Sequence, residues 1–131
     1  MFEAIKYLHD NQIAHRDINL KNILISKVND NGTLHIQLVD FGCARYLPEG
    51  QAFTRYQGQD HYVAPEIVNH MTHDEKIDIW SATVCIYTLL SGELPFQGDD
   101  EDEIFEQIKN KEIDFESSDW NHISNQAKRF L

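Results

Sequence analysis

Apolar side chains recur every three to four residues in several stretches of the chain, which is the spacing of one buried face of an α-helix. This spacing predicts helices over residues 2–8, 76–90, 102–109 and 123–131. The stretch 76–90 is apolar on nearly every face, so we expect a helix that is buried on all sides. Such a helix is predicted to form the centre of the core.

Two shorter stretches, residues 22–26 and 35–40, have the β-like pattern of a half-buried strand. The turn-forming sequence Asn-Asp-Asn-Gly at residues 29–32 lies between them and predicts a hairpin with a long loop. Residues 42–62 show no sustained period and are expected to form an extended loop, and ordered loops of this length are usually functional. These elements together predict an α+β fold in which helices dominate.

The composition fits one domain, because 131 residues with 41% hydrophobic and 25% charged side chains can form a single packed core. The 22 acidic residues outnumber the 11 basic ones and give a formal charge of −11. This charge repels nucleic acid phosphates and anionic lipid surfaces. We therefore expect neither nucleic acid nor a membrane as a partner.

The two cysteines, Cys43 and Cys85, lie far apart and form no CxxC pair. This argues against a zinc site or a disulfide framework and favours a reducing, intracellular setting. Glu3 and Lys6 place charges in the only apolar stretch near the start, which excludes a signal-peptide core there. The longest apolar run, residues 80–90, is too short to span a bilayer. We expect a soluble, cytoplasmic protein.

Four short motifs follow one another along the chain: HRD at residues 15–17, Asn22 five positions after the aspartate, DFG at residues 40–42 and APE at residues 64–66. The gaps between them have the length of loops. This order and spacing resembles the signature of eukaryotic protein kinase catalytic domains. The resemblance covers essentially the whole chain, because residues 78–96 also look like helix F of kinases and the loop that follows it.

The resemblance implies a protein-kinase-like fold, with residues 1–131 as a partial kinase domain: most of the helical C-terminal lobe with its small hairpin, without the N-terminal lobe. Residues 119–131, which include Trp120, are most similar to the calcium/calmodulin-dependent kinase group. Tyr62 before the APE motif is typical of Ser/Thr kinases. The implied reaction is transfer of the ATP γ-phosphate to Ser/Thr hydroxyls of a protein substrate.

Three residues are implied, by their match to the motifs, to carry this chemistry. Asp17 would accept or orient the proton of the substrate hydroxyl. Asn22, through its amide oxygen, and Asp40 would hold Mg²⁺ at the phosphates of ATP. Each residue taken alone is better explained as a turn or cap residue, but the joint order of the motifs favours the functional interpretation.

The residue before the catalytic aspartate, Arg16, marks in this family kinases whose activation loop is ordered by a phosphate that pairs with the arginine. The first candidate for the phosphorylated residue is Thr54, and Tyr56 is the second. The alternative is that Thr54 is an ordinary exposed loop residue.

Two acidic residues are implied to have structural roles. Asp78 lies in the predicted central helix, where a charge is costly unless it is hydrogen-bonded, and matches a family aspartate that bonds the backbone around His15 and Arg16. Glu66 of the APE motif pairs in the family with an arginine, which here would lie beyond Leu131.

Two positions depart from the usual Ser/Thr kinase pattern. A lysine is usual two residues after the catalytic aspartate, and a threonine that it contacts is usual before APE, but this chain has Asn19 and Gln59 there. Both members of one interaction are therefore replaced together. Lys21, four residues after Asp17, is the alternative catalytic source of that positive charge.

The chain shows no Gly-rich loop, strand lysine, helix C glutamate or hinge segment with which kinases hold ATP. We therefore expect the 131 residues alone to have no kinase activity. The complete protein is expected to be a Ser/Thr kinase that uses ATP and Mg²⁺ and meets a protein substrate and a regulatory protein that the sequence does not specify. The alternative hypothesis is a pseudokinase, or a truncated non-catalytic module that binds partners through the helical lobe.

Overall fold

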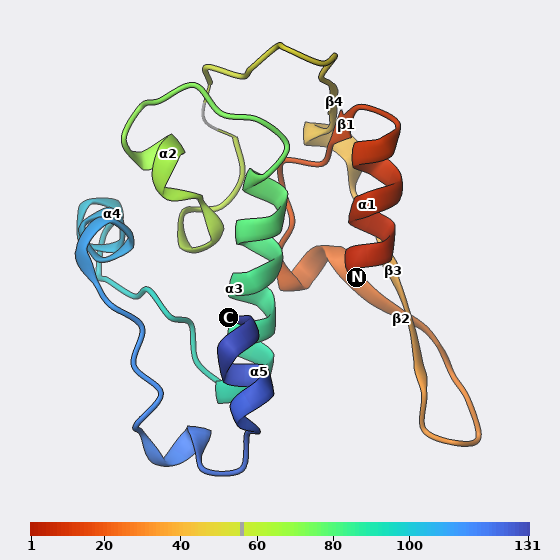
Figure 1. Ribbon diagram of the computed structural model, residues 1–131, viewed down its shortest axis with the longest axis vertical. Helices are drawn as coiled ribbons and strands as arrows, with labels where there is room; N and C mark the ends of the chain where they lie inside the picture. The colour runs from red at the N-terminus through yellow and green to blue at the C-terminus, as the bar shows by residue number, and fades with distance from the viewer. Residues whose placement is uncertain (56) are drawn as a thin grey trace.

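Helix α3 (Ile77–Ser91) runs through the middle of the molecule, and the other elements are arranged around it (Figure 1). This computed structural model describes residues 1–55 and 57–131. Helix α1 (Phe2–Asp10) packs beside α3. The remaining helices and strands are β1 (Ile13–Ala14), β2 (Ile23–Val28), β3 (Leu34–Leu38), β4 (Arg45–Tyr46), α2 (Pro65–Val68), α4 (Glu101–Asn110) and α5 (Asn125–Phe130).

The end of α3 follows from its sequence. Gly92 adopts a left-handed backbone with φ of 85°, and its N–H donates to the carbonyl of Thr88 at 2.9 Å, as is common at helix C-termini. The expectation that α3 is buried on all sides is wrong, because the side chains of Ile79 and Leu89 are 40% and 68% exposed. The elements that pack most closely against α3 are α1 and two short 3₁₀ turns, and they leave these two side chains uncovered.

Two groups of buried side chains form the core, and α3 contributes to both. The group that we call the α4 cluster consists of Val63, Ala64, Ile67, Val68, Ile77, Val84, Phe96, Ile104 and Ile108. The group that we call the α1 cluster consists of Ile5, Ile18, Ala82 and Cys85. Ile23 and Leu38 of the hairpin pack against the α1 cluster. The loop between β1 and β2 is thus held to α3 through Ile18.

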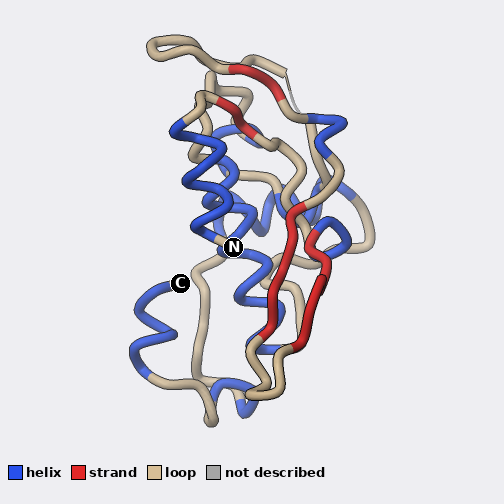
Figure 2. Tube along the Cα trace, turned by 90° about the vertical axis from the view of Figure 1, so that its right-hand side faces the viewer, coloured by secondary structure: helices blue, strands red, loops and turns tan. Residues whose placement is uncertain are grey.

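Strands β2 and β3 form the predicted hairpin, and Figure 2 shows them running side by side. Aliphatic residues face each other across the two strands, as in the pairs Ile23 with Leu38 and Ile25 with Ile36. An irregularity between Ile25 and Lys27 shifts the register before the last two pairs. The hairpin places the residue that precedes it, Asn22, next to residues 39–41, since the N–H of Val39 donates to the carbonyl of Asn22 at 2.9 Å.

The helices predicted from hydrophobic spacing begin and end within two residues of the observed ones. Helix α4 begins at a side-chain cap, because the carboxylate of Asp100 accepts the N–H of Glu103 at 2.9 Å. The antiparallel pair of β1 with β4 was not predicted, and it joins Ile13 to Tyr46 inside the expected loop 42–62. Within residues 1–55 and 57–131, no helix has the length and apolarity needed to cross a membrane.

The two cysteines differ in burial and therefore in expected reactivity. Cys85 is fully buried in the α1 cluster, and burial raises the pKa of its thiol to about 12, whereas Cys43 is only half-buried. Because the thiolate is the reactive form, we expect a thiol reagent at pH 8 to label Cys43 and leave Cys85 unmodified in the folded protein. Mass spectrometry after labelling measures this, and both thiols should react in denaturant. Rapid labelling of folded Cys43→Ser protein would contradict the burial of Cys85.

Candidate active site

The buried carboxylate of Asp78 in α3 holds the loop between β1 and β2. Its Oδ2 accepts the N–H of His15 and its Oδ1 accepts the N–H of Arg16, both at 2.8 Å. Nε2 of His9 in α1 is a third partner at 2.9 Å from Oδ2. Asp78 is 1% exposed, and hydrogen bonds of this kind to a charged acceptor are the strong ones. The expected bond from Asp78 to the backbone at residues 15 and 16 is confirmed, and His9 adds a partner that sequence reasoning missed.

The fully buried side chain of His15 ties this loop to residues 39–41. The N–H of Asp17 donates to Nδ1 of His15 at 3.3 Å, so the ring proton lies on Nε2, which donates to the carbonyl of Val39 at 3.1 Å. The ring also meets the ring of Phe41 edge to face, with centroids 4.9 Å apart. The HRD and DFG motifs are therefore joined through one histidine.

Two asparagine side chains hold the carboxylate of Asp17. Nδ2 of Asn22 donates to Oδ2 of Asp17 at 3.1 Å and to its main-chain carbonyl at 2.9 Å. Nδ2 of Asn19 donates to Oδ1 at 2.9 Å and to the same carbonyl at 3.1 Å. The structure thus brings Asp17 and Asn22 into direct contact. Asn19, at the position where a lysine is usual, also contacts Asp17 through its side-chain amide.

Asn22 and Asp40 each retain an oxygen that can serve a hard cation. Both hydrogen atoms of the Asn22 amide are used by Asp17, so its Oδ1 is the atom left for a metal ion. Asp40 is exposed, has a left-handed backbone with φ of 60°, and uses Oδ1 to accept the N–H of Gly42 at 3.2 Å. Carboxylate and amide oxygens fit Mg²⁺. The described residues contain no cluster of three or more His, Cys, Asp or Glu that would form an all-protein metal cage.

Lys21 and Gln59 do not restore the interaction that the sequence lacks. The side chain of Lys21 is exposed, and its ammonium has no hydrogen bond or ion pair within the described part of the chain. Its main-chain N–H donates to Oδ1 of Asn19 at 3.0 Å. Gln59 begins the 3₁₀ turn Asp60–Tyr62, and no side-chain bond between it and Asn19 occurs among the residues described.

Arg16 has a left-handed backbone with φ of 69° and lies over the residues that follow β4. Its guanidinium carbon is 4.4 Å from the ring centre of Phe53, and its Nη2 donates to the carbonyl of Arg55 at 3.1 Å. Burial, followed by the positive charge of Arg45, lowers the pKa of Arg16 from its ordinary value. Its Nε is buried without a partner among the described residues.

A cavity of about 330 Å³ opens beside this arginine. Exposed Thr54 lines it, and no described acidic side chain does. The other lining residues are Arg16, Arg45, Ala52, Phe53, Arg55 and Gln57. The second candidate for phosphorylation, Tyr56, lies outside the described residues.

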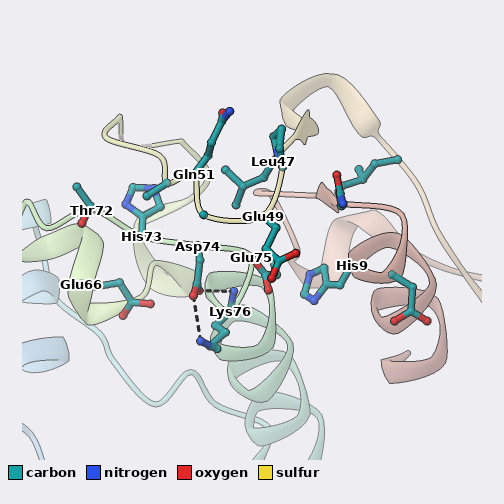
Figure 3. A pocket seen from close by; sticks show the side chains of 16 residues that line it. His9, Leu47, Glu49, Gln51, Glu66, Thr72, His73, Asp74, Glu75 and Lys76 are labelled. Atoms are coloured by element: carbon teal, nitrogen blue, oxygen red, sulfur yellow. Dashed lines mark hydrogen bonds and ion pairs between the residues drawn. The ribbon is translucent and has the colours of Figure 1, made fainter.

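Figure 3 shows a larger cavity, of about 830 Å³. Asp17, Asn22 and Asp40 are not among the residues that line it. His9 and Glu66 line it, and the ion pair between Asp74 and Lys76, 3.0 Å long, lies at its edge. Glu66 has no ion pair within the described residues, so its expected arginine partner is not among them.

Comparison with known proteins places the chain in a family. The family model described as protein kinase domain matches residues 1–131. The chain belongs to the protein kinase domain family. The kinase-like α+β fold inferred from the motifs is confirmed by this match together with the predominance of helices and the small hairpin.

Individual kinases agree with this assignment. The chain is 43% identical to serine/threonine-protein kinase PEPKR2 of Arabidopsis thaliana, 39% to calcium-dependent protein kinase 25 of the same plant and 39% to serine/threonine-protein kinase 33 of Bos taurus. Each comparison covers 98% of this chain and 26%, 24% and 28% of the respective relative, so the chain spans about a quarter of their length. The expected resemblance to Ser/Thr kinases of the calcium/calmodulin-dependent group is confirmed.

The anchoring of the loop that carries the HRD motif by Asp78 can be tested by substitution. We expect Asp78→Ala to lower the free energy of unfolding by about 2–5 kcal/mol, because two buried N–H groups and His9 lose their acceptor. Urea unfolding measures the change, and hydrogen exchange should become faster at the amides of residues 15 and 16. The matched control is Asp10→Ala, since Asp10 is 60% exposed and, within residues 1–55 and 57–131, has no ion-pair partner other than Lys6. Equal effects of the two substitutions would refute the anchoring role.

Proposed function

We propose that the complete protein transfers the γ-phosphate of ATP to Ser/Thr hydroxyls of protein substrates. The observation that carries the proposal is the carboxylate of Asp17, which is held by two amides at 2.9 and 3.1 Å and remains partly accessible. Asn22 and Asp40 lie close by, linked through Val39. A carboxylate fixed in this way can orient a hydroxyl for in-line attack, which is most of what phosphoryl transfer requires of a protein.

The proposed reaction assigns one proton to Asp17. The hydroxyl oxygen of the substrate bonds to the γ-phosphorus, the bond from that phosphorus to the bridging oxygen breaks, and ADP leaves. A carboxylate oxygen of Asp17 takes the hydroxyl proton. Each oxygen has a second lone pair beyond the one used by an asparagine, so an acceptor position is left for the substrate.

ATP and Mg²⁺ are the proposed cofactors, and Asn22 Oδ1 with Asp40 would hold the metal. When bound, Mg²⁺ neutralises charge on the phosphates. Lys21 is the proposed source of positive charge from this chain, since its ammonium is exposed and uncommitted among the described residues and its backbone is fixed by Asn19. The whole protein's setting is proposed to be intracellular, where ATP is available, with a protein substrate and a regulatory protein as partners.

The second candidate function is a pseudokinase that binds partners without transfer. The observation that favours it is the missing cation, because Asn19 uses its amide entirely within the loop and Gln59 supplies no replacement. The two hypotheses separate in one experiment on the complete protein. Mg²⁺-dependent nucleotide binding without phosphate transfer would support the pseudokinase.

Substitution of the proposed base tests the kinase hypothesis. We expect Asp17→Asn in the complete protein to lower kcat by at least about a hundredfold, because the amide cannot take the hydroxyl proton. Transfer from radiolabelled ATP to a peptide library measures the rate. The companion variant Asp40→Asn should weaken Mg²⁺-dependent nucleotide binding, and Asp30→Asn in the exposed hairpin turn is the control for both. Unchanged phosphate transfer by the Asp17→Asn variant would refute the assignment of Asp17 as the base.

Thr54 is proposed to be phosphorylated, with its phosphate bound by the arginines that line the 330 Å³ cavity. In that case phosphatase treatment of the complete protein lowers kcat, by roughly tenfold if one or two charge-assisted hydrogen bonds order the segment. Thr54→Ala should abolish the response to phosphatase, and Thr33→Ala in the hairpin turn should preserve it. Phosphopeptide mapping identifies the residue. A phosphatase response that survives in Thr54→Ala would exclude this site.

A further inference from the structure

Asn19 and Asn22 bind Asp17 in the same way from two directions. Each amide nitrogen donates one hydrogen bond to the main-chain carbonyl of Asp17 and one to a carboxylate oxygen. Asn19 takes Oδ1 and Asn22 takes Oδ2, at 2.9 and 3.1 Å. The four bonds fix both the main chain and the side chain of Asp17, so the orientation of the carboxylate plane is determined by two neutral donors.

The remaining atom of the Asn19 amide is also committed. Its Oδ1 accepts the N–H of Lys21 at 3.0 Å and so begins the 3₁₀ turn Leu20–Asn22, which carries Asn22. Asn19 is 1% exposed, and every polar atom of its side chain has a partner within the loop. A side chain in this state has no group left for a phosphate or a substrate. Its contribution must therefore pass through Asp17 or through the turn.

We propose that Asn19 is a positioning residue, which fixes the Asp17 carboxylate toward the substrate hydroxyl by neutral hydrogen bonds. The proposal rests on the proposed kinase function and assigns a role to a position where the family usually has a lysine. A lysine at this place is a flexible point charge with three donors and no acceptor. An asparagine supplies a donor for Asp17 and an acceptor for Lys21 at once, which an ammonium cannot do. Compared with a lysine, Asn19 has no positive charge, but it holds the carboxylate of Asp17 in a fixed orientation.

Substitutions at residue 19 separate the donor from the acceptor. Asn19→Ala removes both, and we expect kcat of the complete protein to fall by roughly ten- to a hundredfold, with KM for ATP and for the peptide within about twofold, because only the orientation of Asp17 changes. Asn19→Asp keeps an acceptor for the N–H of Lys21 but turns an oxygen toward Oδ1 of Asp17, so kcat should fall at least as far. Thermal unfolding of each variant establishes whether it remains folded.

The matched control is Asn31→Ala, because Oδ1 of Asn31 accepts the N–H of Thr33 at 3.0 Å in the same local arrangement, but in the turn between β2 and β3. Its kcat should equal that of the unsubstituted protein. Wild-type kcat in Asn19→Asp would overturn the proposal, since the acceptor alone would then account for the residue, and this variant decides the question if Asn19→Ala does not fold. A rise in KM with unchanged kcat would overturn it equally.

Asp17→Asn, measured in the same assay, distinguishes failure of this proposal from failure of the proposed function. If Asp17→Asn loses transfer while both Asn19 variants keep it, the positioning role alone is wrong. If Asp17→Asn keeps transfer, the assignment of Asp17 as base fails, and the role of Asn19 fails with it.

Discussion

The structure depends on the buried carboxylate of Asp78, which is the one charged side chain of helix α3. Asp78 lies between two main-chain N–H groups and His9, and an isolated charge at 1% exposure would be strongly unfavourable without them. The interaction fixes the backbone of His15 and Arg16 relative to the centre of the core. The contact of His15 with Val39 and the contacts of Asn19 and Asn22 with Asp17 are all made by residues of the loop that Asp78 fixes.

Two of the four described non-glycine residues with a positive φ belong to the HRD and DFG motifs. Arg16 and Asp40 both have left-handed backbones, with φ of 69° and 60°, a conformation that is unfavourable for residues other than glycine and is tolerated best by Asn and Asp. The bonds from Asp78 hold the strained Arg16, and the bond from His15 to Val39 holds the segment that enters Asp40. The site is therefore kept in shape by contacts to the core, and local preference alone would not produce it.

Much of the fold could be predicted from the sequence, and the reasons for success and failure are physical. Hydrophobic spacing located α1, α3 and α4 because each of these helices buries apolar side chains. The hairpin was located by its β-like strands and its turn sequence, but the expectation of half-buried strands is wrong, because most side chains of β2 and β3 are exposed. The same reasoning overestimated the burial of α3, since spacing records how apolar a face is and not what covers it, as Ile79 and Leu89 show. Strands β1 and β4 have two residues each, too few to display a period. The motifs predicted Asp17, Asn22 and Asp40 as site residues, but the role proposed for Asn19 depends on three hydrogen bonds of its side chain that no residue pattern encodes, apart from the weak Asx-turn signal of an asparagine two residues before Lys21.

The β2–β3 hairpin has a consequence for the handling of this polypeptide. Paired residues across two strands point to the same side, so one face of the ribbon is formed entirely by aliphatic residues, namely Ile23, Ile25, Val28, Leu34, Ile36 and Leu38. Four of them are at least 40% exposed, and each strand of a two-stranded sheet has one edge with unsatisfied backbone groups. An aliphatic ribbon with open edges is a template for strand addition between molecules. Self-association and low solubility of the isolated 131 residues would therefore originate at this hairpin, and a charge introduced on its aliphatic face is the direct remedy.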